Sequence, residues 1–528
     1  MKISSPRYAA MSNVDASVGS PQRLAMQGDA RRPVRFHGRL VGHAFLVRCA
    51  LQTLGKIIWS DFGDSMRALV LDPIVSVYDD RLVLEGFSSD QSLYGRLDLD
   101  RSLFEAIGPV QPGTTNIDFT WWLYDALRQI RSSRETFLQI GPEGLGLVTG
   151  DDRPHVEEKV DVSDDWVRGF LNLQSAMSMP GTMFRMRAVD LLHVIRYVQQ
   201  HRAPQPPRAL RFEFVPGSDV RVVLEPWEHA VPLKGAVHGY TEQRVIRTWG
   251  RNRLEVVESL LPYADEVEVY LKGRALPSFY VLRLPGITLT AGLSGWAENA
   301  WSGTSGFGLL SSDSAGDEAL LRRAGEHLER MQVAGREDLA RVLGEPPERV
   351  GWALQRLCRQ GHAMMDLRER RYRHRQLFQE SIDEPVIFPP DRRLEEARRL
   401  IAGQRVTVRH CGIRETVKDR QYRDPNTGGL VLKQVVYHEW LVQGSAGEQP
   451  EVELVINDDG RIIFGRCGCE HFRLNHLNQG PCEHMLALYM ASVPQRPDGA
   501  VPPVQVRVVK MADGGAGGAA DDGGEEDR

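Results

Sequence analysis

The sequence predicts an α+β, multidomain protein, and three observations support this class. The chain has 528 residues, 42% of them hydrophobic, so it is long enough for roughly three domains with cores of their own. In residues 34–302, short β-like runs alternate with turns and a few helical patterns. A helical group of elements and a small cysteine-containing group follow. We therefore expect a mixed α/β N-terminal region, a helical domain and a small C-terminal domain.

The N-terminal region begins after a segment without an apolar period. Residues 1–33 are rich in Ser, Ala, Arg, Pro and Gln, which is typical of disorder. Residues 67–87 contain two apolar runs separated by Asp79 and Asp80, and this pattern predicts a hairpin. The Pro-rich stretch at 202–208 is expected to separate two lobes.

Residues 119–131 have the pattern of an amphipathic helix. Asp118 is a suitable N-cap, and six apolar residues form a stripe: Phe119, Trp122, Leu123, Ala126, Leu127 and Ile130. The adjacent Trp121 and Trp122 allow either ligand stacking or core packing. Because aromatic residues at helical spacing belong more often to a core, we expect core packing.

The next domain is predicted at residues 317–379, after a Gly- and Ser-rich linker at 303–316. Three helical patterns are followed by two β-like runs, in the order GDEALLRRAGEHLERM, REDLARVLG, PPERVGWALQRLCRQG, HAMMDL and RRYRHRQLF. Three helices followed by a hairpin resemble a winged helix-turn-helix domain. In that fold the third helix enters the DNA major groove and the hairpin touches the backbone.

Arginines on the third helix and on the hairpin are the candidate partner-binding residues of this domain. They are Arg349, Arg356, Arg359, Arg370, Arg371, Arg373 and Arg375. Such a cluster is suited to nucleic acid. The alternative is a solvated face, or pairing with acidic neighbours such as Glu348 and Glu369 in a winged helix that contacts protein. Both interpretations remain open from the sequence.

The C-terminal domain is predicted at residues 392–495 and carries the most specific pattern of the chain. Runs typical of a small sheet lead to RCGCEHFRLNHLNQGPCEHM at 466–485. Alternate residues of a strand point to the same side, so Cys467 and Cys469 can direct both sulfurs at one ion. Gly468 between them lets the backbone curl without a side chain in the way.

The second pair of candidate ligands lies at the start of a helix. The helical pattern begins after Gly480 and Pro481, so Cys482 is expected at or just before the helix cap. There the positive end of the helix dipole would lower the pKa of its thiol, while His484 projects from the first turn. Three Cys and one His complete a tetrahedral set for one structural Zn²⁺.

Other roles for these residues are a disulfide, buried free thiols or a redox pair. A CxC pair is too tight for an easy disulfide, and without a secretory signal the compartment is expected to be reducing. His471 and His476, in the insert, are expected to be exposed or hydrogen-bonded rather than ligands. The set His410, Cys411 and His438 lacks ligand spacing, and we expect ordinary core and surface roles for it.

The spacing of the four candidate ligands resembles the SWIM zinc finger, whose pattern is CxCx(n)CxH in a ββα setting. In this chain CxC is followed by twelve residues, then by CxH and an apolar helix. The resemblance implies a zinc-dependent module that binds DNA or protein. The phrases GTTNIDFTWWL, LPSFYVL and GLSGWAENAW also resemble the N-terminal region of a bacterial group of SWIM zinc finger proteins. That group is associated with MoxR-type AAA+ ATPases and von Willebrand A-domain proteins, so the resemblance implies protein partners of these kinds.

The charge of the chain argues against a general polyanion binder. The formal net charge is -5, and residues 512–528 carry six acids and one Arg, so the rest of the chain is formally neutral. The tail at 496–528 is acidic and Gly-rich and is expected to be disordered. The sequence has no run of about eighteen apolar residues, the length a membrane span needs, and we expect a cytoplasmic protein without a membrane partner.

Catalytic signatures are missing from the sequence. It contains no GxxxxGK[ST], no GxSxG and no HExxH, and no small-molecule substrate is indicated. Asp118 and Asp125 could be imagined in a nuclease, but nothing fixes a triad. We therefore expect a zinc-binding, non-enzymatic interaction protein that contacts nucleic acid, protein or both. The alternatives are a purely protein-binding scaffold and a transposase- or nuclease-related enzyme.

Overall fold

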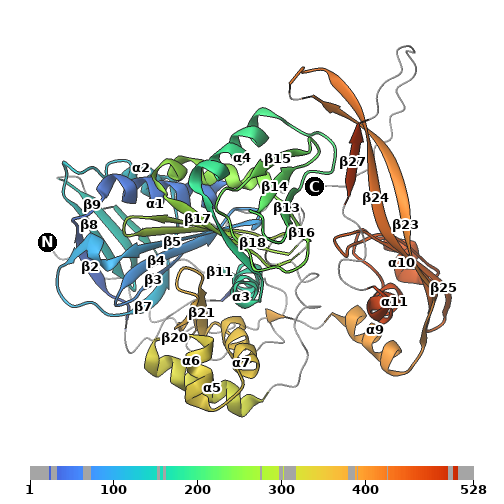
Figure 1. Cartoon of the computed structure of the whole chain (residues 1–528). Coiled ribbons are helices and arrows are strands. Elements are labelled where there is room, and N and C mark those ends of the chain that lie inside the picture. Colours follow the sequence, from blue (N-terminus) through green and yellow to red (C-terminus); the bar gives the residue numbers. More distant parts are fainter. Residues whose placement is uncertain are drawn as a thin grey trace.

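The computed structural model has three parts, which Figure 1 shows as an N-terminal body, a helical part below it and a C-terminal part beside it. We call them the N-terminal body (33–301), the three-helix module (317–378) and the C-terminal domain (391–508). The structure describes residues 23–24, 33–62, 73–150, 155–158, 162–273, 276–295, 301, 317–378, 387–388, 391–424, 426–496 and 504–508. The segments expected to be disordered or linking, 1–33, 303–316 and 496–528, lie almost wholly outside these residues.

An eight-stranded antiparallel sheet forms the centre of the N-terminal body. Its strands, in spatial order, are β12 (Thr182–Arg187), β17 (Glu266–Leu271), β18 (Ser278–Leu284), β19 (Ile287–Leu293), β5 (Leu93–Asp100), β4 (Arg81–Phe87), β3 (Ile74–Val77) and β7 (Gly113–Asn116). Leu97 of β5 pairs with Leu289 of β19, so the sheet joins strands from both sides of the 202–208 segment. Most residues of β3, β4, β5 and β19 are buried, because other elements cover the sheet.

Two smaller sheets flank the central one. The five-stranded sheet contains β10 (His155–Glu158), β9 (Gly144–Thr149), β8 (Thr136–Gly141), β2 (Phe36–Leu40) and β6 (Phe104–Ala106). The four-stranded sheet contains β15 (His229–Pro232), β14 (Arg221–Leu224), β13 (Leu210–Phe214) and β16 (Arg244–Thr248). The two-residue strands β1 (Arg23–Leu24) and β11 (Val162–Ser163) pair with each other.

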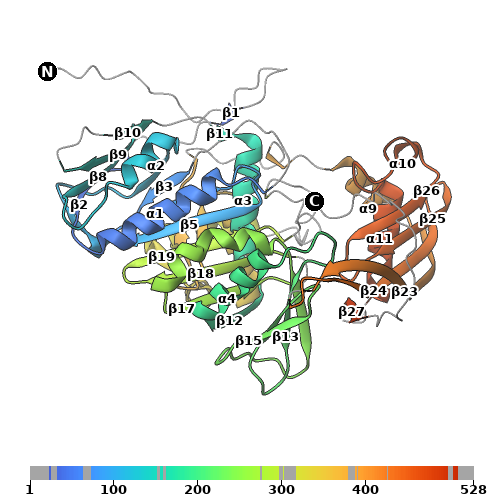
Figure 2. The ribbon, with the colours of Figure 1, turned by 90° about the horizontal axis from the view of Figure 1, so that it is seen from above.

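Helices of the N-terminal body pack against these sheets. They are α1 (Ala44–Trp59), α2 (Trp121–Leu127), α3 (Asp164–Ser178), α4 (Ala188–Gln200) and the 3-10 segments η1 (Arg101–Leu103) and η2 (Arg251–Tyr263). Figure 2 shows α1 lying across the central sheet. A Cβ on Gly95 of β5 would lie 2.8 Å from Cδ1 of Ile57, so the close approach of α1 requires glycine at this position.

The predicted hairpin is present, and the predicted helix differs from expectation. β3 and β4 pair around Asp79 and Asp80, while residues 67–72 lie outside the described part. The helix α2 is capped by Thr120, whose Oγ1 accepts the Leu123 N–H at 3.2 Å, and not by Asp118.

Core packing of the adjacent tryptophans was a wrong prediction. Trp121 and Trp122 are 55% and 72% exposed. α2 has only seven residues, and its buried positions are Leu123 and Leu127, one turn apart. The tryptophans therefore lie off the buried face of the helix, and Trp121 stacks on Tyr124 with ring centroids 5.5 Å apart.

The three-helix module consists of α5 (Glu318–Met331), β20 (Val333–Ala334), α6 (Arg336–Leu343), α7 (Pro347–Arg359), β21 (Ala363–Asp366) and β22 (Arg371–His374). Its strands form one antiparallel sheet in the order β20-β22-β21. On α7 the apolar residues Val350, Ala353, Leu354 and Leu357, which recur at helical spacing, are all buried. Met331, the last residue of α5, is 41% exposed.

The three-helix module packs directly on the N-terminal body. Helix α7 lies against α3, and Nε2 of Gln355 is 3.3 Å from Oγ of Ser175. Leu367 and Phe378 belong to the same buried cluster as Phe170 of α3. The module is therefore fixed to the body by shared core packing.

The C-terminal domain is a helix-covered meander. It contains α9 (Arg392–Ala402), β23 (Val406–Arg423), β24 (Leu430–Ala446), β25 (Gln449–Ile456), β26 (Ile462–Cys467), α10 (Glu470–Asn475), α11 (Glu483–Ser492), η3 (Val493–Gln495) and β27 (Gln505–Val508). β23 to β26 pair in sequence order, and β27 adds to β24. None of the described helices of the chain is long and apolar enough to cross a bilayer.

The turn between β25 and β26 ties the C-terminal domain to the N-terminal body. Oδ2 of Asp458 accepts a hydrogen bond from Nη1 of Arg247 at 2.9 Å, and both side chains are buried. Asp459 accepts one from Nε1 of Trp249 at 3.2 Å. Since charges removed from water need partners, these contacts fix the position of the domain.

Candidate metal centre

The end of one strand and the starts of two helices bring the four predicted ligands together. Cys467 is the last residue of β26, where it pairs with Val452 of β25. Cys469 is the N-cap of α10, and its Sγ accepts the Phe472 N–H at 3.5 Å. Cys482 is the N-cap of α11 and His484 lies in the first turn, as the sequence predicts.

The four side chains form a compact and largely buried group. One ligand atom from each of Cys467, Cys469, Cys482 and His484 lies within 4.8 Å of all the others. The cysteines are 6%, 8% and 0% exposed, in sequence order. Donors of a tetrahedral ion with bonds of about 2.3 Å are roughly 3.8 Å apart, so a small contraction would close the group around one ion. The cluster could therefore hold one metal ion.

The hydrogen bonding of His484 fits a ligand role. Its Nδ1 is buried and accepts or donates no hydrogen bond within the described residues. The carboxylate of Glu483 lies 3.4 Å from this nitrogen and would pair with it only if the ring were protonated. A buried imidazole nitrogen beside three thiols is suited to a metal ion, which satisfies the nitrogen without a proton.

Crowding of the thiols perturbs their pKa values in the metal-free chain. The hydrogen bond from Cys482 lowers the pKa of the Cys467 thiol. The same hydrogen bond, together with burial, raises the pKa of Cys482 to about 12. The helix dipole was expected to lower it, but the hydrogen bond with Cys467 and burial outweigh the dipole. A bound cation would reverse this balance, because it stabilises all the thiolates.

The other histidines and cysteines of this domain do not extend the cluster. His476 is exposed and His471 is half-buried. Among the described residues, only the Cys467, Cys469, Cys482 and His484 group meets the geometry for three or more His, Cys or carboxylate ligands. His410, Cys411 and His438 are not part of such a group among these residues.

The candidate arginines of the third helix are held within the chain. Nη1 of Arg349 donates to Glu345 at 2.6 Å, and its Nη2 donates to Asp317 at 2.8 Å. Arg359 lies over the ring of Phe388, 4.3 Å from its centroid. Arg356 is half-buried on α7, whose neighbour is α3. The face of α7 that would enter a DNA groove is therefore partly covered by the N-terminal body.

The hairpin arginines divide into exposed and buried pairs. Arg370 is exposed, and Arg371 is half-exposed and pairs with Asp338 at 2.9 Å. Arg373 and Arg375 are 3% and 2% exposed, which differs from the exposed wing expected from the sequence. The hairpin lies against the central sheet, so these two guanidinium groups face carboxylates of the N-terminal body and not solvent.

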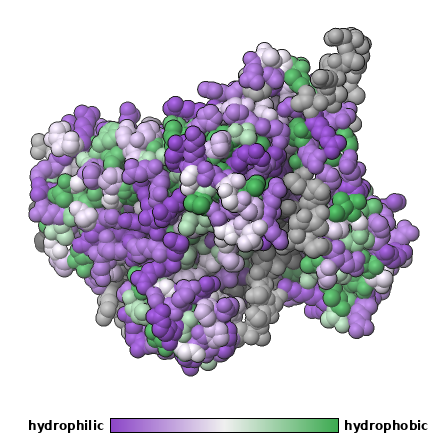
Figure 3. All heavy atoms as spheres, viewed as in Figure 1, coloured by the Kyte–Doolittle hydropathy of each residue, from purple (hydrophilic) through white to green (hydrophobic). Residues whose placement is uncertain are grey.

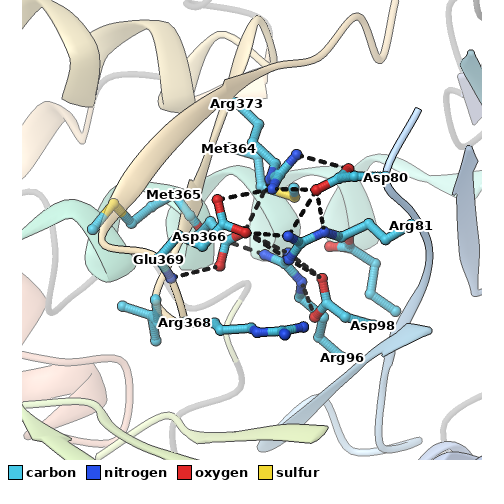
Figure 4. Close-up of polar contacts among 12 residues, drawn as sticks. Asp80, Arg81, Arg96, Asp98, Met364, Met365, Asp366, Arg368, Glu369 and Arg373 are labelled. Atoms are coloured by element: carbon cyan, nitrogen blue, oxygen red, sulfur yellow. Dashed lines mark hydrogen bonds and ion pairs between the residues drawn. The ribbon is translucent and has the colours of Figure 1, made fainter. Parts of the chain in front are cut away.

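A buried ion-pair network at this contact was missed from the sequence (Figure 4). Asp366 of β21 accepts hydrogen bonds from Arg373 at 2.9 Å and from Arg81 of β4 at 3.1 Å. Asp80 binds both of these arginines, and Arg375 pairs with the fully buried Glu85 at 3.0 Å. The partners are almost 300 residues apart, so no local pattern could have predicted them.

Comparisons with known proteins add little to this description. No protein-family model matches the sequence, and no curated protein matches it. Among solved structures, Proliferating Cellular Nuclear Antigen from Entamoeba histolytica is 12% identical with a TM-score of 0.36, and the alignment covers 49% of this chain and 98% of that chain. The PCNA2-PCNA3 complex from Sulfolobus tokodaii is 10% identical with the same TM-score and coverage. So slight a likeness carries no argument about function.

Proposed function

We propose that this chain is a zinc-binding, non-enzymatic interaction protein that contacts other proteins through its C-terminal domain. The observation that carries the proposal is the Cys467, Cys469, Cys482 and His484 cluster, which offers four protein ligands to one ion. Four protein ligands leave no position for water or substrate, which is typical of a structural ion and not of a catalytic one. Thiolate and imidazole donors in a tetrahedral set favour zinc.

The arrangement of strands and helices in this domain supports our proposal that residues 392–495 form a SWIM-type zinc finger. The cluster lies between a pair of antiparallel strands, β25 and β26, and the apolar helix α11, in agreement with a ββα setting. Zinc bound there would hold the end of β26 against the start of α11. We also propose a cytoplasmic location, because a reducing compartment keeps the three thiols available to the ion.

For the three-helix module we propose a winged helix used for protein contact. The order α5, β20, α6, α7, β21, β22 supports the winged-helix arrangement. The packing of α7 on α3 and the burial of Arg373 and Arg375 favour protein contact over DNA contact, since these groups are already engaged inside the chain. Nucleic acid binding through exposed residues such as Arg371 remains the alternative to be tested.

Exposed apolar side chains near the ligands support a protein partner. Phe464, three residues before Cys467, is 50% exposed, and Leu474 of α10 is 74% exposed. Figure 3 shows hydrophobic residues at the surface of the C-terminal domain. Exposed large apolar residues beside a rigid site are frequent in protein interfaces. MoxR-type AAA+ ATPases and von Willebrand A-domain proteins are the first partners to test, because of the family resemblance, and the chain would act as an adaptor between them.

The experiment is a pull-down from the native cell with the full chain, performed with nucleic acid digested or retained. We expect the same protein partners in both cases, and loss of these partners when Phe464 and Leu474 are both changed to Ser. The control is Val237→Ser in the N-terminal body, which removes an apolar side chain that is 78% exposed, comparable to Leu474, from a part of the chain with no proposed partner contact. Partners that disappear on nuclease treatment, or that survive the double change, would contradict the proposal.

The nucleic acid alternative has its own measurement. Phosphate contacts release counterions, so specific retention on DNA would fall steeply with salt and would weaken in Arg371→Glu. Retention that shows both properties would favour the nucleic acid function over the protein one.

A further inference from the structure

The hairpin of β23 and β24 concentrates cationic side chains on one of its two faces. Alternate residues of a strand share a face, and paired residues of neighbouring strands lie on the same side of the sheet. Within residues 413–422 of β23, the three cations therefore share one face, and the two acids, Glu415 and Asp419, lie on the other. Lys433 of β24, which pairs with Arg420, joins the cations. We call the set Arg414, Lys418, Arg420 and Lys433 the cationic face.

Within the paired residues 413–422 and 431–440, the cationic face contains one carboxylate. It belongs to Glu439, which pairs with Arg414 at 2.9 Å. Nζ of Lys433 donates to a neutral partner, the carbonyl oxygen of a proline in the N-terminal body, at 3.0 Å. Nε of Arg420 is buried and has no hydrogen-bond partner among the described residues. One carboxylate among four cations leaves a positive potential on this face, which favours a negatively charged segment.

The outer edge of β23 lies at the open side of the sheet. In the order β23-β24-β25-β26, no described strand pairs with this edge. In a twofold antiparallel pairing of two copies, residues of the same face would lie opposite one another. Cations would then meet cations on one face and acids would meet acids on the other, which destabilises the pairing. A second copy is therefore a poor occupant of this edge.

The last described strand ends beside the cationic face. Val508, the final residue of β27, pairs with Lys433 of β24, and Lys433 pairs with Arg420 on its other side. Neighbouring strands are about 4.8 Å apart, so the backbone of Val508 lies about 10 Å from that of Arg420. Figure 1 shows β27 beside β24 in the projecting hairpin. The next acid of the chain, Asp513, comes five residues later, and five residues span up to roughly 17 Å. The acids after β27 can therefore reach the cationic face.

The segment that follows β27 has the complementary charge. Residues 512–528 carry six acids and one Arg, and they are rich in glycine. Glycine-rich chains are flexible and can follow an irregular surface. Because the segment is tethered so close to the cationic face, its effective concentration there is in the millimolar range. An acidic segment of another protein would need a comparable local concentration to compete with it.

We propose that the acidic segment 512–528 docks on the cationic face of the same chain. Its carboxylates pair with Arg420 and Lys418 and continue toward Arg414. The contact shields these cations from other polyanions, nucleic acid included, until a more acidic partner displaces the segment. This inference goes beyond the proposed partner contacts of Phe464 and Leu474, and it holds or fails independently of them.

Zero-length carbodiimide cross-linking of the purified full chain, read by mass spectrometry, tests the contact directly. Lys418 is half-buried on the cationic face, and its amine should join carboxylates of 512–528. Lys56, exposed on α1 of the N-terminal body, is the matched control and should join none of them. Sodium chloride at about 1 M, where charges act over roughly 3 Å, should abolish the Lys418 cross-links.

A labelled decaglutamate peptide measures the shielding. Changing the six acids of 512–528 to their amides should strengthen its binding roughly tenfold, because the tethered competitor is lost. Adding Arg420→Gln to this variant should weaken the binding again. Arg423→Gln, which removes an exposed cation from the opposite face of β23, should weaken it much less. Circular dichroism checks that each variant keeps its fold.

Frequent cross-links between Lys418 and 512–528, together with stronger peptide binding by the amide variant, would support the contact. Equal binding by the wild type and the amide variant, or cross-links no more frequent at Lys418 than at Lys56, would overturn it. In a mixture of unlabelled and isotope-labelled chains, cross-links that join one kind to the other would place the segment on a second copy and would also overturn the proposal.

Discussion

Replacing Asp366 by Asn removes the central carboxylate of the buried network between the three-helix module and the N-terminal body. The side chain is 2% exposed and faces three guanidinium groups, from Arg373 at 2.9 Å, Arg81 at 3.1 Å and Arg96 at 3.8 Å. Asn keeps the size of the side chain but not its charge. The three cations then lie together in the interior with one compensating charge fewer.

The expected cost follows from the burial of the network. Removing one partner of a buried ion pair costs about 3 to 5 kcal/mol, because the other charge stays buried without compensation. The amides of β21 and β22 should then exchange with solvent roughly two to three and a half orders of magnitude faster. Hydrogen–deuterium exchange of peptides that cover Ala363–His374 measures this directly.

An exposed ion pair of Arg371, which lies in β22 together with Arg373, offers a matched control. Arg371 and Asp338 are also 2.9 Å apart, but their side chains are 44% and 42% exposed. Asp338→Asn should cost about 0 to 1 kcal/mol, as exposed ion pairs usually do. If the two variants exchange alike in Ala363–His374, burial of the Asp366 network does not hold the module, and the reasoning is refuted.

Three further predictions concern the pH dependence of this network, the contact between Asp458 and Arg247, and a close approach inside the C-terminal domain. Burial alone would raise the pKa of Asp366, but Arg96, Arg81 and Arg373 lower it below 3.8. The contribution of Asp366 to stability is therefore complete above about pH 5 and lost progressively as the pH falls through the ordinary Asp pKa toward the lower folded-state value, which denaturant titrations from pH 7 to 3 would show. Asp458→Asn should weaken the contact with Arg247 by about 1 to 3 kcal/mol and increase the radius of gyration in X-ray scattering, while zinc content stays the same. Gly444→Ala places a Cβ 2.1 Å from the Thr407 carbonyl oxygen and should lower the melting temperature, by about 1 to 3 kcal/mol of stability, whereas Gly429→Ala in the open turn should not.

The sequence was sufficient to find the candidate metal ligands because the spacing of each pair is local. Cys467 ends β26 and Cys469, two residues later, caps α10, while Cys482 caps α11 and His484 lies in its first turn, so each pair is held together by its short separation along the chain. Only the approach of one pair to the other depends on tertiary structure.

For the arginines of the hairpin, by contrast, the sequence was not sufficient to predict which side chains are exposed. Arg371 and Arg373 are alternate residues of one strand, and the sequence treats them alike. One is half-exposed and the other is buried against Asp366 and Asp80, because the hairpin lies on a sheet formed by distant residues. The prediction that the tryptophans of α2 pack in the core was wrong for a related reason. The length of a helix decides which residues share its buried face, and α2 is shorter than the sequence pattern suggests.

The most direct test of the central claim is the metal content of the cysteine cluster. Native mass spectrometry of the full chain, after brief dialysis against a weak chelator that removes exchangeable ions, should show one tightly held zinc. Cys482→Ser should lose this ion and unfold β26 and α11, because the ligands fold around the metal. A chain that is fully folded without zinc, or a Cys482→Ser variant that retains it, would contradict the account.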